Sequence, residues 1–259
     1  MKNITRSVLK NLEISSIDNT MKKLGISAIS LFLFLMFFIA GCADSVEKKI
    51  NKAGYEADGP GLIEAVKNND IESVKLFIEN KTPLNFADIL GATALMHAAK
   101  LNDPAMLTLL INSGAEIVIT DNGKKTSLHY AIEKGYEKNV TILLEKGVDP
   151  LWKDNLGRDA FLTLLTITPT ANMNIFNMLI DKKADINGRD NDRKTPLIIA
   201  VERNIPGYVE ALISMKANPL AKDFKGKTAL DYAYEKLEKK EISPELVQTI
   251  EEFVMTTKP

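Results

Sequence analysis

Residue types that carry much of protein chemistry are scarce in this chain of 259 residues, which has one cysteine, two histidines and one tryptophan. A single cysteine excludes an intrachain disulfide, and it leaves no second thiolate for a structural zinc site. The two histidines, His97 and His129, are too far apart in the sequence to match a short metal-ligand motif. We therefore assign both histidines structural roles and predict no metal site.

Sequence motifs of the common catalytic sites are also missing. The chain contains no Gly-x-Ser-x-Gly motif, no phosphate-binding P-loop and no glycine-rich dinucleotide motif. Its many acidic residues fall mostly at loop starts and on the polar faces of predicted helices, where exposure to solvent explains them. The sequence therefore predicts a protein that is not an enzyme, with no cofactor and no small-molecule substrate.

Basic charge is not in excess either. The formal net charge is -1. Removing residues 1–41, which read as an export signal, takes away five of the 33 basic residues and two of the 34 acidic ones and leaves a net charge of -4. Proteins that bind nucleic acid show a basic face, so this balance argues against a nucleic-acid partner.

The export signal consists of Lys22 and Lys23 followed by residues 24–41, which carry no charge. It ends in Ile39-Ala40-Gly41-Cys42, which resembles the lipobox of bacterial lipoproteins. The resemblance implies that residues 1–41 are removed and that Cys42 carries a diacylglycerol thioether at the new N-terminus. Cys42 is thus the predicted lipidation site and the predicted contact with the membrane.

Several alternatives stay open in this region. The apolar run is long enough to span a bilayer as an uncleaved anchor, and either arrangement puts the rest of the chain on the side of the membrane opposite the lysines. Residues 1–20 have mixed charge, so translation starting at Met21 is a second possibility. Residues 42–54 are expected to form the lipidated end and a flexible polar tether. Asp44 resembles an inner-membrane retention signal, but that rule varies between bacterial groups.

One seven-residue sequence motif, which we call the phrase, recurs along the chain. Its best copy is Thr126-Ser127-Leu128-His129-Tyr130-Ala131-Ile132, and other copies begin at Thr93, Thr195 and Thr228, with weaker ones at 60–65 and 159–164. The third residue of each copy falls at 62, 95, 128, 161, 197 and 230, so the steps are 33, 33, 33, 36 and 33. A fixed period of this length indicates a stacked-repeat architecture.

The phrase and its spacing resemble ankyrin repeats, and an Asp opens each unit from the second to the sixth. The resemblance covers about residues 55–259 and implies an all-α solenoid of about six helix–turn–helix units with short β-hairpin fingers. It also implies that His129 bonds backbone near the fingers. The expected units are 55–87, 88–120, 121–153, 154–189, 190–222 and 223–259.

The residue types of the phrase have local physical reasons. A threonine before a helix accepts a backbone N–H bond and caps its start. Gly114 and Gly147 follow second helices, where a left-handed cap is needed. The three extra residues of unit four, near 168–172, are expected to lengthen the turn between its helices, and Pro244 to begin a last helix. No unit can bury its apolar face alone, so stacking supplies the core.

In ankyrin-repeat proteins the fingers and first helices form a concave recognition surface, so apolar finger residues are candidates for contact with a partner. Aromatic anchors are over-represented at binding hot spots. The alternative is that these side chains pack finger against finger, and the sequence leaves both open. The candidates are Phe86, Ile89, Leu90, Ile119, Trp152, Leu156 and Phe224.

The predicted function is a non-enzymatic protein–protein interaction module. Lipid would anchor it outside the cytoplasm, with the repeats in the periplasm or on the outer face of the cytoplasmic membrane, and its concave face would bind another exported protein. Narrower versions are an immunity-type protein that neutralises a periplasmic toxin and a scaffold for a periplasmic enzyme. The alternative from another class is an enzyme whose site is built on the repeats.

Overall fold

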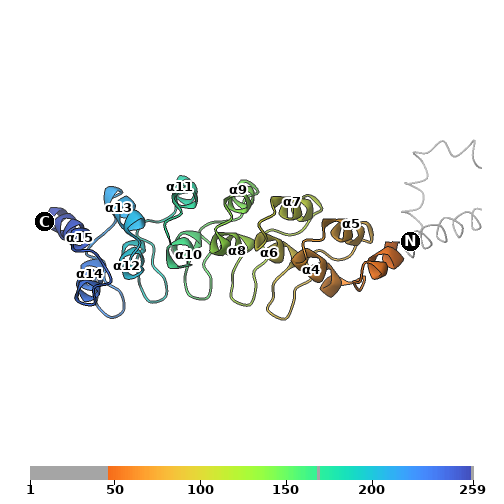
Figure 1. Cartoon of the computed structure of the whole chain (residues 1–259), viewed down its shortest axis with the longest axis horizontal. Helices are drawn as coiled ribbons and strands as arrows, with labels where there is room; N and C mark the ends of the chain where they lie inside the picture. The colour runs from red at the N-terminus through yellow and green to blue at the C-terminus, as the bar shows by residue number, and fades with distance from the viewer. Residues whose placement is uncertain (1–45, 168–169, 258–259) are drawn as a thin grey trace, which may run out of the picture. The chain divides into compact units, whose positions relative to one another are not determined.

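A computed structural model describes residues 46–167 and 170–257 of the chain (Figure 1). The predictions on the export signal, Met21, Cys42 and Asp44 lie outside these residues. Within the described ranges, no helix is both long and apolar enough to cross a membrane.

The prediction of a flexible tether over residues 42–54 is wrong for residues 46–52, which the structure describes as a helix. Residues 46–52 are helical, and the side chains of Val46 and Ile50 are buried. The two are four residues apart and so lie on one face of the helix. Three charged residues separate them, which is why the segment looked uniformly polar in the sequence.

Residues 55–259 form a compact unit of their own, in which helices follow one another in pairs. The first helices of the pairs lie in one row and the second helices in another (Figure 1). The first helices are α4 (Gly59–Lys67), α6 (Ala94–Ala99), α8 (Ser127–Lys134), α10 (Ala160–Ile167), α12 (Pro196–Glu202) and α14 (Ala229–Glu238). The second helices are α5 (Ile71–Glu79), α7 (Pro104–Asn112), α9 (Glu137–Glu145), α11 (Met173–Asp181), α13 (Pro206–Ser214) and α15 (Pro244–Thr257). The all-α repeat solenoid is confirmed.

The ends of the helices follow the predicted local chemistry. The hydroxyls of Thr93, Thr195 and Thr228 each accept the backbone N–H three residues later at the start of a first helix. Such a cap typically stabilises a helix by about 1 kcal/mol. After the second helices, Gly114 and Gly147 have φ values of 94° and 89°, the left-handed conformation that glycine adopts without strain.

The core runs along the row of first helices, each of which packs closely on the next. The third residue of the phrase is buried in the first five units: Leu62, Leu95, Leu128, Phe161 and Leu197. Small residues of the same helices, such as Ala98, Ala131 and Ala200, are fully buried and let neighbouring helices approach. The phrase therefore recurs because each copy supplies one layer of a continuous core.

Two predicted loop features have different outcomes. The lengthened turn of unit four stays a prediction, because residues 168 and 169 of that turn lie outside the residues that the structure describes. The β-hairpin fingers are not found: over residues 46–167 and 170–257 the structure has only an isolated bridge between Ala87 and Thr93. The fingers instead project from the first helices as loops (Figure 1), on the side away from the second helices.

Candidate functional site

The end of each finger is a five-residue turn that opens with the repeated Asp. In the first of them, the backbone N–H of Asp88 donates to the carbonyl of Ala92 at 3.0 Å, and the Asp88 carboxylate accepts the N–H of Ala92 at 3.0 Å. The same reciprocal pair recurs in every turn, and the fourth residue always has a positive φ. The Asp is thus explained as the cap of its own turn. We call these segments finger turns: 88–92, 121–125, 154–158, 190–194 and 223–227.

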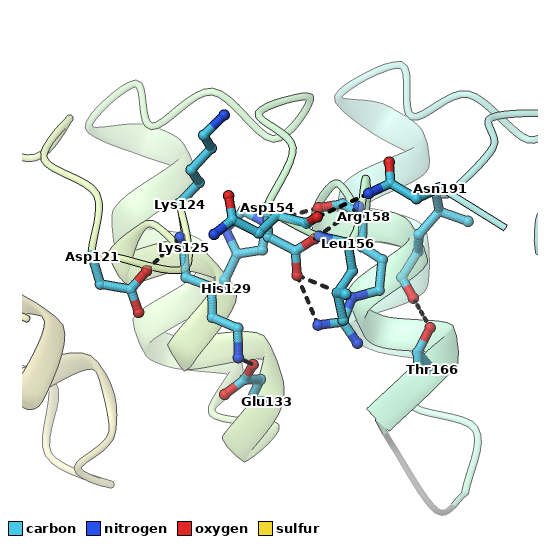
Figure 2. A network of polar contacts seen from close by, with 12 residues as sticks. Asp121, Lys124, Lys125, His129, Glu133, Asp154, Leu156, Arg158, Thr166 and Asn191 are labelled. Carbon is cyan, nitrogen blue, oxygen red and sulfur yellow. Dashed lines mark hydrogen bonds and ion pairs between the residues drawn. The ribbon is translucent and has the colours of Figure 1, made fainter. Parts of the chain in front are cut away.

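Backbone hydrogen bonds join the finger turns into a ladder. From the second turn onward, the N–H of the second residue of each turn donates to the carbonyl of the third residue of the preceding turn, as Asn191 does to Leu156 at 2.9 Å (Figure 2). Where that second residue is Asn, its side-chain amide adds a bond to the preceding turn. These amides are Asn122 to Ile89 at 3.2 Å, Asn155 to Asn122 at 2.9 Å and Asn191 to Asn155 at 2.8 Å. The ladder holds the finger turns in line.

Most of the opening carboxylates also receive a hydrogen bond from a side chain. The donors are His97 to Asp88 at 2.8 Å, Tyr130 to Asp121, Arg158 to Asp154 at 2.7 Å and Tyr232 to Asp223 at 2.6 Å. Burial alone would raise the pKa of Asp88, Asp154 and Asp223, but the hydrogen bonds to their carboxylates hold each pKa below its ordinary value. These carboxylates are therefore ionised and satisfied at neutral pH.

Lysines at the last position of three finger turns reach back to a glutamate on the following first helix. Lys125 contacts Glu133 at 2.5 Å (Figure 2), Lys194 contacts Glu202 at 2.6 Å, and Lys227 contacts Glu235. Unit four departs from this pattern, because Arg158 turns to Asp154 and Thr166 stands in place of the glutamate (Figure 2). The pairs are partly exposed, so solvent screens them, and the Lys125–Glu133 and Lys194–Glu202 pairs each contribute at most about 1 kcal/mol to stability.

His129 joins two neighbouring units. Its Nδ1 contacts the Thr126 hydroxyl at 2.9 Å, and its Nε2 contacts the carbonyl of Arg158 in the next unit at 3.2 Å (Figure 2). Burial lowers the pKa of His129, which favours the neutral ring. The predicted structural role is confirmed. Over the described residues, no group of three or more His, Cys, Asp or Glu side chains could hold a metal ion.

The predicted partner-contacting residues fall into two groups. Those at the tips of the finger turns are exposed: Ile89 by 95%, Phe224 by 68%, Leu90 by 65% and Leu156 by 56%. Those in the loop leading into a turn are more covered: Trp152 and Phe86 are exposed by 45% and 41%, and Ile119 is half-buried. The indole N–H of Trp152 donates to the carbonyl of Lys124 in the preceding finger turn at 3.0 Å. Trp152 therefore packs between fingers and still presents one side to solvent.

Sequence reasoning missed one further set of exposed apolar side chains. Val118, Leu151 and Leu220 occupy the same position in three units and are all exposed. They share the repeat period, so that period was the signal that could have identified them. They extend the apolar surface from the finger turns along the loops that lead into them.

A family profile for ankyrin repeats (three copies) matches residues 62–154 and 167–253, which is more than half of the chain. The chain belongs to the ankyrin-repeat family. An ankyrin-repeat array is a protein–protein interaction module, which the matched relatives also indicate.

The ankyrin-repeat relatives resemble only part of this chain. It is 36% identical over 88 residues to NF-kappa-B inhibitor alpha of Rattus norvegicus, a match of 32% of this chain and 28% of the relative. It is 37% identical over 82 residues to neurogenic locus notch homolog protein 1 of Danio rerio, covering 31% of this chain and 3% of the relative. It is 43% identical over 63 residues to 2-5A-dependent ribonuclease of Mus musculus, covering 24% and 9%. The chain spans under a third of the length of each of these relatives.

Proposed function

We propose that the ankyrin-repeat array binds another exported protein through its finger face, while lipid on Cys42 anchors the chain outside the cytoplasm. The finger face is the surface formed by the finger turns and the exposed ends of the first helices. The observation that carries this proposal is the row of exposed apolar side chains at the tips of hydrogen-bonded turns, with Ile89, Leu90, Leu156 and Phe224 as its members.

The finger face has the properties of a pre-formed binding surface. Its exposed apolar side chains lie on the first, third and fifth finger turns, and the turns between them, 121–125 and 190–194, are polar. The face therefore offers separate apolar anchor points within a polar surface. The ladder between turns fixes their backbone, so little conformational entropy is lost when a partner binds. Ion pairs such as Lys125–Glu133 and Lys194–Glu202 lie behind the tips and supply the polar rim that interfaces carry around an apolar centre. The proposed activity is binding alone, without catalysis.

A capture experiment tests the finger face. The full chain is used as bait in detergent-solubilised membranes, beside the double variant Ile89→Ser/Phe224→Ser. We expect the variant to capture at least about tenfold less partner than the unmodified chain, because a hot-spot side chain contributes about 2 kcal/mol or more to binding. Quantitative mass spectrometry of the captured proteins gives the measurement.

The matched control for this capture is Met255→Ser. Met255 is an apolar residue exposed by 71%, close to the 68% of Phe224, but it lies on α15 in the row of second helices. The Met255→Ser variant should capture as much partner as the unmodified chain. Equal capture by the finger variant and by Met255→Ser would move the binding site off the finger face.

The anchor is tested by Cys42→Ser. Without the thiol there is no thioether lipid, so the variant should leave the detergent phase in a Triton X-114 partition and appear in the aqueous phase. The unmodified chain should partition into detergent and show a mass that fits lipidated Cys42 as its first residue. An unmodified chain that partitions into detergent with the mass of the unlipidated, uncleaved sequence would instead indicate an uncleaved apolar anchor.

A further inference from the structure

Unit five is the exception among the opening aspartates. Asp190 accepts the backbone N–H of Lys194 at 2.8 Å, but within the described residues no side chain donates to its carboxylate. The helix position that holds Tyr130 in unit three and Tyr232 in unit six is occupied by Ile199. An isoleucine has no donor, and burial raises the pKa of Asp190. Asp190 is thus a partly buried acceptor whose usual partner is missing.

A cavity of about 220 Å³ lies beside Asp190, between units four and five. Leu156 and Ile199 form its apolar wall, and Arg158 and Lys194 supply cationic groups. Pockets for drug-sized ligands begin near 300 Å³, so this one is suited to a single side chain. The cavity opens on the finger face, since Leu156 is one of the exposed tip residues.

The chain itself fills the equivalent place twice with a tyrosine. The Tyr232 hydroxyl donates to Asp223 at 2.6 Å, and the ammonium groups of Lys194 and Lys227 lie 5.7 and 5.3 Å from its ring centroid. Arg158, Lys194 and Lys227 are the last residues of three consecutive finger turns. Arg158 and Lys194 therefore have the same repeat positions relative to Ile199 as Lys194 and Lys227 have relative to Tyr232. Both cations, Arg158 of unit four and Lys194 of unit five, line the cavity.

Tyr130 confirms that the arrangement is not peculiar to one unit. Its hydroxyl donates to Asp121, and its ring lies 3.9 Å from the Lys100 ammonium and 5.5 Å from that of Lys125. A carboxylate acceptor and flanking cations therefore surround a phenol in units three and six. Unit five retains the acceptor and the cations but lacks the phenol.

We propose that the cavity between units four and five receives a tyrosine side chain of the bound partner, with its hydroxyl on Asp190 and its ring beside Arg158 and Lys194. This rests on the proposed function, because it names the group that the partner presents. A phenol fits because it is a neutral donor with a π-face for the cations. The cavity is lined by as many carboxylates as cationic groups, three of each, so it favours a neutral donor over a guanidinium or ammonium group. An aliphatic side chain would leave Asp190 without a donor.

The test is a titration of the full chain in detergent with N-acetyl-tyrosinamide, beside N-acetyl-phenylalaninamide. Methyl NMR follows Ile199 and Leu156. The tyrosine probe should give saturable shifts at both residues, with affinity at least about tenfold higher than the phenylalanine probe, because a hydrogen bond to a charged group is lost with the hydroxyl. No saturable shift with the tyrosine probe, or equal affinity for the two probes, would overturn the tyrosine site.

Two variants complete the test. Ile199→Tyr supplies the phenol from within the chain, so it should abolish probe binding and raise the melting temperature. Ile199→Phe fills the space without the hydroxyl, so it should also block the probe but melt below Ile199→Tyr. Probe shifts that persist at Leu156 in both variants would contradict the assignment. The titration needs no partner: a failed capture counts against the proposed function, and a failed titration counts against the tyrosine site.

Discussion

Leu128→Ala is expected to lower the free energy of unfolding by about 2–5 kcal/mol, the range for a buried leucine that leaves a cavity. Leu128 is fully buried in α8, which packs against α6 on one side and α10 on the other. Its truncation removes contacts within its own unit and weakens the interfaces to both neighbours. In a repeat array these nearest-neighbour interfaces are a large part of total stability. Equilibrium urea unfolding followed by circular dichroism measures the change.

The control for this prediction is Leu151→Ala in the same unit. Leu151 is a leucine of the loop after α9 and is exposed by 48%. Its truncation leaves no enclosed cavity, so the loss should stay below about 1 kcal/mol. If Leu128→Ala were as mild as Leu151→Ala, the repeat register that places the third residue of the phrase in the core would be wrong.

Much of this fold follows from local chemistry that repeats. The threonine caps at Thr93, Thr195 and Thr228, the glycine caps at Gly114 and Gly147, and the core leucines each depend on contacts within one unit or with an identical neighbour. Repetition makes such features readable, because a chance match would have to recur at the same spacing. The three extra residues of unit four can be recognised for the same reason, as a single departure from the period.

The features that the sequence concealed depend on how neighbouring units meet. The fingers were expected to be β-hairpins, but the Asp at each turn takes up the backbone N–H groups that a strand pair would use, and the turns bond to their neighbours instead. The orientation of Trp152 depends on a hydrogen bond from its indole N–H to a carbonyl of the preceding finger turn, at Lys124. The bonds between turns and the Trp152 contact each join two repeats, so no pattern within one repeat predicts them.

The side chains that donate to the opening aspartates were only partly predictable from the sequence. His97, Tyr130, Arg158 and Tyr232 differ in type and come from two positions of the repeat, so no single motif identifies them. Ile199 stands in register with Tyr130 and Tyr232, and the sequence alone could have raised the comparison. It could not have shown that the space left by the shorter side chain stays open beside Asp190.

Gly157→Ala is expected to lower the free energy of unfolding by about 2–4 kcal/mol, through two separate costs. Gly157 has a φ of 75°, where a residue with a Cβ loses about 1 kcal/mol. An added Cβ would also lie 2.4 Å from the Asn191 Oδ1 and 2.8 Å from the Asn191 N. Relieving that contact costs a further 1–3 kcal/mol or so, the range for overpacking, and displaces the ladder bond from Asn191 to Leu156.

Gly226→Ala separates the two costs. Gly226 occupies the same position of its finger turn with a φ of 74°, but nothing lies within 4 Å of its added Cβ. It should therefore lose only the backbone cost of about 1 kcal/mol. Urea unfolding of both variants gives the difference, and hydrogen exchange at the Asn191 amide should become faster in Gly157→Ala alone. Equal destabilisation of the two variants would mean that the ladder yields to the added methyl group, and that the finger face is held by its helices and not by bonds between its turns.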